Sequence, residues 1–314
     1  MKIVITGALG HIGSSLIRSL AADFPDLELV LIDNLLTQRF CSLFDLPAAA
    51  RYRFLEADVT SADLRPVFEG AHAVVHLAAM TEAAASFNRP EQVESNNYQA
   101  TLRVSEACGE TGARLFMPSS TSVYGTARST VSEDCSPDEL NPQSPYAATK
   151  LKEEQVVQDM VRSKGLRAVT CRFGTIFGTS KGMRFHTAVN KFCWQAVMGI
   201  PLTVWKTALD QRRPYLDLHD ACMAVSFLIE KDLFDGGVFN ILTLNATVRD
   251  IVETIREFVP DVRTNLVDSP IMNQFSYDVS CERFQGTGFT FTGDLKAGVK
   301  ETVGLLRAAN SARN

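Results

Sequence analysis

Residues 2–13 read KIVITGALGHIG, an apolar run that leads into glycines at positions 7, 10 and 13. The run predicts a buried strand over Lys2–Thr6, and the residues after the last glycine predict a helix over Ser14–Asp23. A strand, a glycine turn and a helix direct backbone N–H groups toward a pyrophosphate at the positive end of the helix dipole. The spacing G-x-x-G-x-x-G differs from the G-x-G-x-x-G of the standard dinucleotide fingerprint. The turn predicts a dinucleotide site made by Gly7, Gly10, His11, Ile12 and Gly13, with the His11 ring packed over the turn rather than acting as an acid.

A second apolar run, Glu28–Ile32, ends at Asp33 and Asn34, 20 residues after the last glycine of the turn. A carboxylate at this place accepts hydrogen bonds from the ribose hydroxyls of the adenosine. The same charge would repel the 2′-phosphate of NADP, so the sequence favours NAD. Arg39 is the one nearby residue that argues the other way.

Three further runs, Tyr52–Glu56, Ala73–Leu77 and Arg167–Phe173, and a strand ending at Phe116 alternate with helical patterns. Strands alternating with helices predict an α/β fold with a doubly wound parallel sheet. Ligands of such sheets bind at the carboxyl ends of the strands. We therefore expect cofactor contacts from the residues that end these strands, which are Asp58, Val59, Leu77, Ala78, Ala79 and Phe173. For Asp58 an equally good alternative is an acid beside a helix cap at Thr60 or Ser61.

Residues 144–150 read SPYAATK and place Tyr146 four residues before Lys150. On a helix this spacing puts both side chains on one face, one turn apart. An ammonium beside a phenol favours the phenolate, so we expect the pKa of Tyr146 to fall from its ordinary value near ~10. Such a phenolate could take a proton from a sugar or alcohol hydroxyl. A solvated helix face is the alternative reading of the pair taken alone.

The chain has 314 residues, of which 46% are hydrophobic and 21% charged, with a formal net charge of −5. This length suits one large α/β domain and a smaller one. No run of basic residues suggests nucleic acid, and the apolar runs are too short and too often interrupted to span a membrane. The seven cysteines are scattered and show no metal-ligand spacing. We expect no metal site and reduced thiols in a cytoplasmic protein.

The motifs stand in one order along the chain: the glycine turn, Asp33-Asn34-Leu35, Asp58-Val59, His76-Leu77-Ala78-Ala79, Ser120-x-x-Val123-Tyr124-Gly125 and Tyr146-x-x-x-Lys150. Together they resemble the extended short-chain dehydrogenase/reductases, in the NAD-dependent nucleotide-sugar epimerase/dehydratase branch typified by UDP-glucose 4-epimerase. The resemblance implies a Rossmann fold, NAD as cofactor and a nucleotide-diphosphate sugar as substrate. It also implies Ser120, Tyr146 and Lys150 as the catalytic residues, and Asn97 rather than Asn96 as the asparagine that positions the cofactor.

The resemblance divides the chain into an NAD-binding Rossmann domain over residues 1–173, joined by part of 212–242, and a mainly substrate-binding α/β domain over 174–314. It implies substrate contacts from Ser120, Tyr146, Thr175, Arg184, Asn190, Thr203, Trp205 and Arg213. For Arg184 a solvated surface arginine is an equal alternative. Thr175 replaces an asparagine of the family and Pro214 replaces an aspartate, so the base and the sugar stay open.

Dehydratases and decarboxylases of this branch carry acids just before the Val-Tyr-Gly motif, where this chain has Thr121 and Ser122. Hydroxyls are poor acids and bases, so we expect 4-epimerisation through a 4-keto sugar. A dehydratase, decarboxylase or ketoreductase of the same family is the alternative, and a non-catalytic NAD sensor is less favoured. The helices over residues 92–108 and 147–163 resemble the family's dimer interface and predict a homodimer, although their apolar positions could equally belong to the core.

Overall fold

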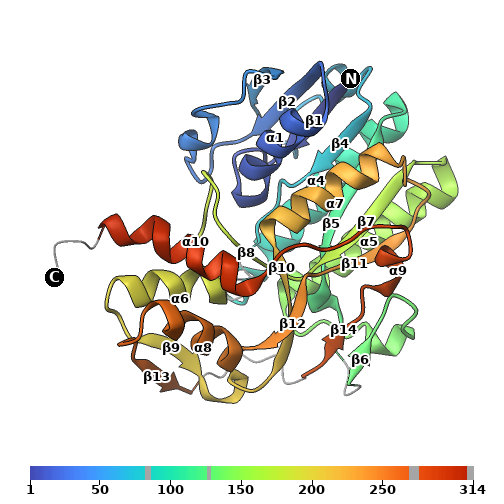
Figure 1. The fold of residues 1–314 in the computed structure, drawn as a ribbon. Coiled ribbons are helices and arrows are strands. Elements are labelled where there is room, and N and C mark those ends of the chain that lie inside the picture. The colour runs from blue at the N-terminus through green and yellow to red at the C-terminus, as the bar shows by residue number, and fades with distance from the viewer. Residues whose placement is uncertain (82–85, 126–128, 269–275, 310–314) are drawn as a thin grey trace.

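The computed structural model describes residues 1–81, 86–125, 129–268 and 276–309. Its largest element is a seven-stranded sheet in the order β11-β7-β5-β4-β1-β2-β3 (Figure 1). All six strand pairings in this sheet are parallel. The strands are β1 (Lys2–Thr6), β2 (Leu27–Asp33), β3 (Ala50–Glu56), β4 (Ala73–His76), β5 (Arg114–Ser120), β7 (Ala168–Phe173) and β11 (Val238–Ile241).

Helices cover both faces of this sheet, because its strands are apolar on both sides. Along β1, Ile3 and Ile5 pack in one core cluster and Val4 in another, as the alternation of side chains in a strand requires. The first cluster includes residues of α1 (His11–Asp23) and α7 (Leu218–Glu230). The second includes residues of α2 (Arg65–Phe68), α4 (Pro90–Thr111) and α5 (Pro145–Lys164). The predicted doubly wound parallel sheet is therefore confirmed.

Strand β5 corrects one prediction, because it does not end at Phe116 but continues through Pro118 to Ser120. Proline has no backbone N–H and so cannot donate a hydrogen bond to a neighbouring strand. It is therefore unfavourable in a central strand, which has a partner on each side. Here β4 pairs with β5 only as far as Phe116, so Pro118 pairs with β7 alone, opposite Cys171. The longer strand brings Ser120 to the carboxyl edge of the sheet.

A smaller α/β part lies below the large sheet in Figure 1. Its three-stranded sheet has the order β12-β10-β8, and β13 pairs with β9 in a two-stranded sheet. Residues of α6, α8 and α10 share one apolar cluster with β9 and β10. The bounds are β8 (Thr175–Phe177), β9 (Leu202–Trp205), β10 (Arg212–Asp217), β12 (Leu244–Thr247), β13 (Thr264–Val267), α6 (Ala188–Val197), α8 (Val248–Phe258) and α10 (Leu295–Arg307).

The remaining elements are short. Strands β6 (Thr130–Val131) and β14 (Asp278–Val279) form a two-stranded parallel pair, and α9 (Glu282–Gln285) is a single turn. Short 3-10 helices span Phe40–Leu43, Thr121–Val123, Pro137–Glu139 and Lys206–Ala208. Among the described residues, no helix combines the length and the apolar character needed to cross a membrane.

Candidate active site

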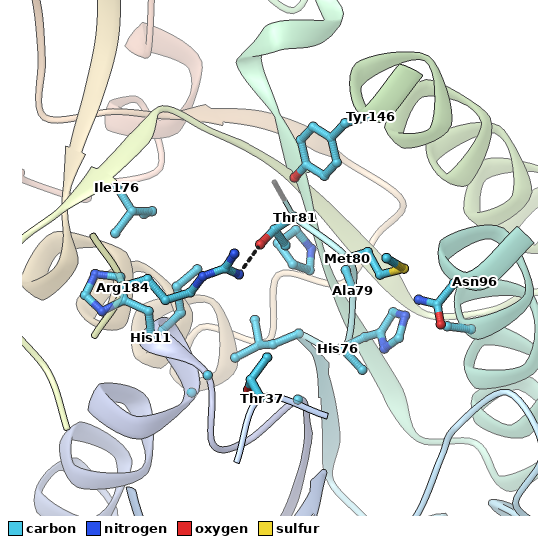
Figure 2. Close-up of a pocket in the computed structure, with 18 of the residues that line it drawn as sticks. His11, Thr37, His76, Ala79, Met80, Thr81, Asn96, Tyr146, Ile176 and Arg184 are labelled. Atoms are coloured by element: carbon cyan, nitrogen blue, oxygen red, sulfur yellow. Dashed lines mark hydrogen bonds between the residues drawn. The ribbon is translucent and has the colours of Figure 1, made fainter. Parts of the chain in front are cut away.

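A cavity of about 550 Å³ opens at the carboxyl edge of the large sheet and extends to the smaller part of the chain. Its walls include the residues that end or follow β2, β3, β4, β5 and β7, together with residues of β8, α5 and the segment before α6 (Figure 2). This is the edge where parallel α/β sheets bind their ligands. The cavity is therefore the place to compare with the predicted site residues.

The glycine turn forms the floor of the cavity and can be built only from glycine at two positions. Gly7 has φ +64°, and a Cβ there would lie 2.6 Å from the backbone nitrogen of Ala78. A Cβ on Gly13 would lie 2.5 Å from the carbonyl oxygen of Ala8, so helix α1 can start directly on the turn. Gly10 caps this helix without any side-chain hydrogen bond. The first N–H groups of α1 thus face the cavity uncapped, which suits a pyrophosphate.

Asp33 and Asp58 line the cavity beyond the turn, after β2 and β3. The two carboxylate oxygens of Asp33 accept hydrogen bonds from the backbone N–H groups of Leu9 (3.0 Å) and Leu35 (2.9 Å). Asp58 accepts from the hydroxyl of Thr60 (2.6 Å) and from the amide of Asn34 (3.0 Å). The Thr60 hydroxyl, the largest influence, holds the pKa of Asp58 below its usual value. Asp58 therefore stands on the cavity wall, whereas the alternative of a helix cap at Thr60 or Ser61 is wrong, because these residues form a turn and α2 begins only at Arg65.

The end of β4 supplies small residues where the backbone of Gly7 approaches. Leu77, Ala78 and Ala79 line the cavity, as do Val59 and Phe173. The two asparagines of α4 take different places. Asn97 is buried, and its amide accepts from Met80 N (2.8 Å) and donates to Met80 O (3.0 Å), whereas Asn96 faces the cavity (Figure 2). Asn97 thus holds the backbone of the cavity wall, and its role toward the cofactor stays a prediction.

The predicted catalytic residues Ser120, Tyr146 and Lys150 all line this cavity. Ser144 caps α5 through its side chain, and the Tyr146 ring on the first turn directs its hydroxyl into the cavity (Figure 2). The buried carboxylate of Glu154 accepts from Arg172 of β7 (2.7 Å), which fixes α5 on the sheet. Ser120 lies at the end of β5, and its hydroxyl shares a hydrogen bond with that of Ser122 (2.8 Å).

The predicted fall in the pKa of Tyr146 is wrong for the chain without a cofactor. Burial raises the pKa of the phenol, and the carboxylate of Glu153 adds to the rise, so the ammonium of Lys150 only partly offsets them. Burial is the larger cause, and Glu153 acts on the phenol because it pairs with Lys150: the Lys150 Nζ lies 2.9 Å from Glu153 Oε2, and both side chains are buried. Burial would lower the pKa of Lys150, but Glu153 outweighs it and the pKa is raised.

A buried chain of hydrogen bonds continues from Glu153, and sequence reasoning missed it. The Thr101 hydroxyl donates to Glu153 Oε2 (2.8 Å) and lies 3.3 Å from His76 Nε2. On the other side of the ring, His76 Nδ1 lies 2.7 Å from the hydroxyl of Thr6 at the end of β1. Burial, aided by Lys150, lowers the pKa of His76 to about 3, so the imidazole is neutral. In the sequence, the only indication of this chain is the spacing of Lys150 and Glu153, which puts the two side chains on one helix face.

The residues predicted for the substrate fall into two groups. Thr175, Arg184 and Trp205 line the cavity together with Ser120 and Tyr146. Three others are absent from its wall, and they are Asn190, Thr203 and Arg213. Asn190 is buried and bonds the backbone of Gly178 on both sides of its amide (3.2 Å each), whereas Thr203 lies in β9 opposite Asn265 of β13.

Arg213 is held at the side of the cavity rather than on its wall. Its guanidinium donates to Arg212 O and Gln211 Oε1 (2.8 Å each) and stacks over the Tyr277 ring, 5.6 Å from the centroid. Several wall residues were not predicted at all, namely Thr37, Met80, Thr81, Ile176, His186 and Thr187. Most of them follow strand ends in loops without a motif, so no local pattern in the sequence identifies them.

The site as a whole fits a dinucleotide. The uncapped start of α1 suits its diphosphate, the Asp33 carboxylate suits a ribose, and the small residues after β4 leave room for a flat ring. Figure 2 shows the Tyr146 hydroxyl at the end of the cavity opposite Thr37. The arrangement can remove a proton and position a hydride donor or acceptor in one enclosed space.

Comparisons with known proteins agree with this geometry. The NAD dependent epimerase/dehydratase family matches residues 3–241. A Bacillus subtilis protein described as an uncharacterized UDP-glucose epimerase, YtcB, is 32% identical over 250 residues, which cover 77% of this chain and 76% of YtcB. The trifunctional UDP-glucose 4,6-dehydratase/3,5-epimerase/reductase of Arabidopsis thaliana is 28% identical over 96% of this chain, which spans about half (46%) of that enzyme.

Among solved structures, the UDP-glucuronic acid 4-epimerase of Bacillus cereus, in complex with UDP-glucuronic acid and NAD, superimposes with a TM-score of 0.86. It is 25% identical, and the match covers 98% of this chain and 100% of the epimerase. The family match spans most of the chain and includes the glycine turn, Asp33, Ser120, Tyr146 and Lys150. The chain therefore belongs to the NAD-dependent epimerase/dehydratase family, and its cofactor is NAD.

Proposed function

We propose that the protein is a nucleotide-sugar 4-epimerase that keeps and reuses its NAD. One observation carries this proposal: the carboxylates on the cavity wall among the described residues are Asp33 and Asp58, which both lie at the predicted adenosine end. Around Tyr146, the wall instead offers hydroxyls, from Ser120 and Ser122. Thr121 turns away, because its hydroxyl donates to the carbonyl of Phe173 (3.2 Å). This set suits the removal and return of one proton better than an elimination.

The chemistry follows from these side chains. The phenolate of Tyr146 takes the proton of the sugar 4-hydroxyl, and the Ser120 hydroxyl hydrogen-bonds the same oxygen. Bound NAD would supply the acceptor for the C4 hydride and, in its reduced form, the donor that returns it. Tyr146 then gives its proton back to the oxygen of the reduced sugar. If the 4-keto sugar presents its other face before reduction, the configuration at C4 is inverted and no net oxidation occurs.

The ammonium of Lys150 stabilises the phenolate from the next turn of α5. In the chain without cofactor, burial and Glu153 keep the pKa of Tyr146 raised. The positive charge of oxidised nicotinamide would favour the phenolate, because an opposite charge nearby stabilises an ionised group. We propose that proton removal by Tyr146 becomes effective only when NAD occupies the site.

The substrate side supports a nucleotide sugar but leaves the sugar open. We propose substrate contacts from Thr175 and Trp205 on the wall, and from Asn190, Thr203 and Arg213, which do not line the cavity in this structure. We propose that the chain is divided into a cofactor domain over residues 1–173, joined by part of 212–242, and a mainly substrate-binding domain over 174–314. A dehydratase, a decarboxylase or a ketoreductase remains the alternative, because the Arabidopsis thaliana relative combines dehydratase and reductase activities.

We also propose a cytoplasmic homodimer. The seven cysteines are free thiols, as expected of a reducing compartment. Val93 and Val104 of α4 and Val157 of α5 are buried within the chain, so a dimer would use outer positions such as Leu102 and Val156. Light scattering of the purified protein measures the assembly directly.

The reaction is tested by incubating the NAD-loaded protein with UDP-glucose, UDP-glucuronic acid and dTDP-glucose in D₂O. A 4-epimerase produces the 4-epimer of one of them with no deuterium on carbon, because the hydride moves internally. A 4,6-dehydratase or a 3- or 5-epimerase places solvent deuterium on carbon, and a ketoreductase consumes NADH stoichiometrically. Solvent deuterium on carbon or stoichiometric consumption of NADH rejects the proposal. NAD binding without turnover of any nucleotide sugar would favour a sensor.

A further inference from the structure

Residues 178–187 connect β8 to α6 and lie directly on the glycine turn. In Figure 1 this yellow-green segment rises from the smaller part of the chain to α1 and returns. Gly182 makes the contact: a Cβ there would lie 2.5 Å from the carbonyl oxygens of both Leu9 and Gly10. The Gly182 N–H donates to the hydroxyl of Ser14 in α1 (2.9 Å). Two backbones can meet this closely only where one of them has no side chain.

The neighbours of Gly182 tie the segment to the cofactor half at further points. The hydroxyl of Ser180 lies 2.7 Å from His11 Nδ1. Lys181 accepts a hydrogen bond at its carbonyl from the thiol of Cys41 (3.1 Å), and its ammonium pairs with Asp45 (3.0 Å). The segment is therefore anchored both to the glycine turn and to the loop that follows β2.

The same segment helps to gather positive charge over the turn. Arg184 and His186 from the segment line the cavity with Arg39 and His11 from the cofactor half. Arg184 reaches across to the hydroxyl of Thr81 (2.9 Å) in Figure 2. His11 Nε2 is buried and has no hydrogen-bond partner among the described residues. Burial and the neighbouring His186, Arg39 and Arg184 lower the pKa of His11 to about 3. With that pKa the His11 imidazole is neutral, so the positive charge comes from Arg39 and Arg184, and the buried Nε2 can hydrogen-bond an oxygen of a bound anion.

We propose that residues 178–187 form the outer wall of the site for the NAD diphosphate, with Arg184 and His11 contacting the diphosphate oxygens opposite the uncapped start of α1. The diphosphate would then be enclosed by backbone N–H groups on one side and by the basic groups on the other. NAD could leave only after the segment lifts from Gly10, which suits a reaction that returns its hydride within one turnover. This inference rests on the assignment of NAD and is independent of 4-epimerisation.

The test measures NAD release from the loaded protein after dilution into a trap enzyme that consumes free NAD. Gly182→Ala adds one methyl group against the carbonyls of Leu9 and Gly10 and should speed release about tenfold to a hundredfold, the worth of one or two charge-assisted hydrogen bonds. Gly304→Ala is the matched control: it lies in α10 with nothing within 4 Å of an added Cβ, and should leave release unchanged. Equal release rates from both folded variants would overturn the proposal.

Arg184→Gln tests the charge without touching Gly182, and it keeps the test decisive should Gly182→Ala fail to fold. Calorimetry would compare ADP-ribose, adenosine and UDP as ligands of the NAD-free protein. The proposal expects weaker binding of ADP-ribose, by about tenfold, with adenosine unchanged. Weaker binding of UDP with ADP-ribose unaffected would assign Arg184 to the nucleotide sugar and reject the diphosphate wall. Because neither experiment needs turnover, they can fail or succeed whatever reaction the protein catalyses.

Discussion

The two sides of the cavity are made in different ways. On the cofactor side, parallel strands end at one edge of one sheet, and the wall is made by residues that end or follow them, such as Gly7, Asp33 and Ala78. On the substrate side, Thr175 comes from β8 and Trp205 from β9, which belong to different sheets. A site made at strand ends depends on local sequence and on one sheet topology. A site made by long side chains from separate elements depends on how those elements pack.

Tyr146 belongs to both sides, so its loss should have the largest effect. Tyr146→Phe removes the phenol oxygen and keeps the ring, and turnover should fall about 10²- to 10⁴-fold, the usual worth of general acid–base catalysis. Turnover is measured with saturating substrate, and thermal unfolding shows whether the fold is kept. Near-normal turnover by a folded variant would show that Tyr146 is not the proton acceptor.

Asp33 tests the cofactor side. Asp33→Ala should weaken NAD binding about tenfold to a hundredfold, since it deletes charge-assisted hydrogen bonds to the ribose and to the backbone of the turn. The preference for NAD over NADP should shrink, because the carboxylate no longer repels a 2′-phosphate. Titrating both cofactors into the wild-type chain and the variant measures this. A wild-type chain that binds NADP as tightly as NAD would make Arg39, rather than Asp33, the determinant.

Glu153 tests the buried chain that joins the two sides. Its carboxylate pairs with Lys150 and raises the pKa of Tyr146, while Lys150 and Arg184 lower it. Removing the charge in Glu153→Gln should therefore lower the pKa of Tyr146. Because the phenolate is the active form, the acid limb of the turnover–pH profile should move to lower pH. Glu153→Asp keeps the charge and should stay near the wild-type profile. An acid limb that does not move in Glu153→Gln would reduce Glu153 to a structural role.

Arg213 tests the substrate side and should have the smallest effect. The resemblance makes it the anchor of the substrate diphosphate, although it donates to Arg212 and Gln211 at the side of the cavity. We expect Arg213→Ala to raise KM several-fold, on the order of fivefold, with kcat nearly unchanged, as for a contact made equally in ground and transition states. A collapse of kcat at constant KM would place Arg213 in the chemistry instead.

Sequence reasoning succeeded where the backbone is the constraint. Gly7 must be glycine because of its positive φ and the nearness of Ala78, and that requirement is visible in a one-dimensional pattern. It failed where a side chain has a partner from far along the chain. The spacing of Tyr146 and Lys150 predicts their shared face, but it does not show that Glu153 takes the ammonium or that burial raises the pKa of the phenol.

The close approach of Gly182 to Gly10 shows the same limit, because a lone glycine in a connecting segment reads as an ordinary turn until the fold brings the two backbones together. Asn190 is the converse case. The sequence predicts a substrate contact for its side chain, but in the structure the amide bonds the backbone of Gly178. Local patterns therefore predict the cofactor side well, and the substrate side needs the packed structure.

In the proposed reaction Tyr146 removes the proton of the 4-hydroxyl while the hydride leaves C4, and the same hydride then returns to C4. The most direct measurement follows a nucleotide sugar deuterated at C4 through turnover in ordinary water, with NMR or mass spectrometry locating the label in the product. The 4-epimer should keep its deuterium at C4, and Tyr146→Phe should make almost none of this product. Deuterium lost to water, or found at C6 of the product, would contradict the account, since the label would then have left the carbon at which the configuration should invert.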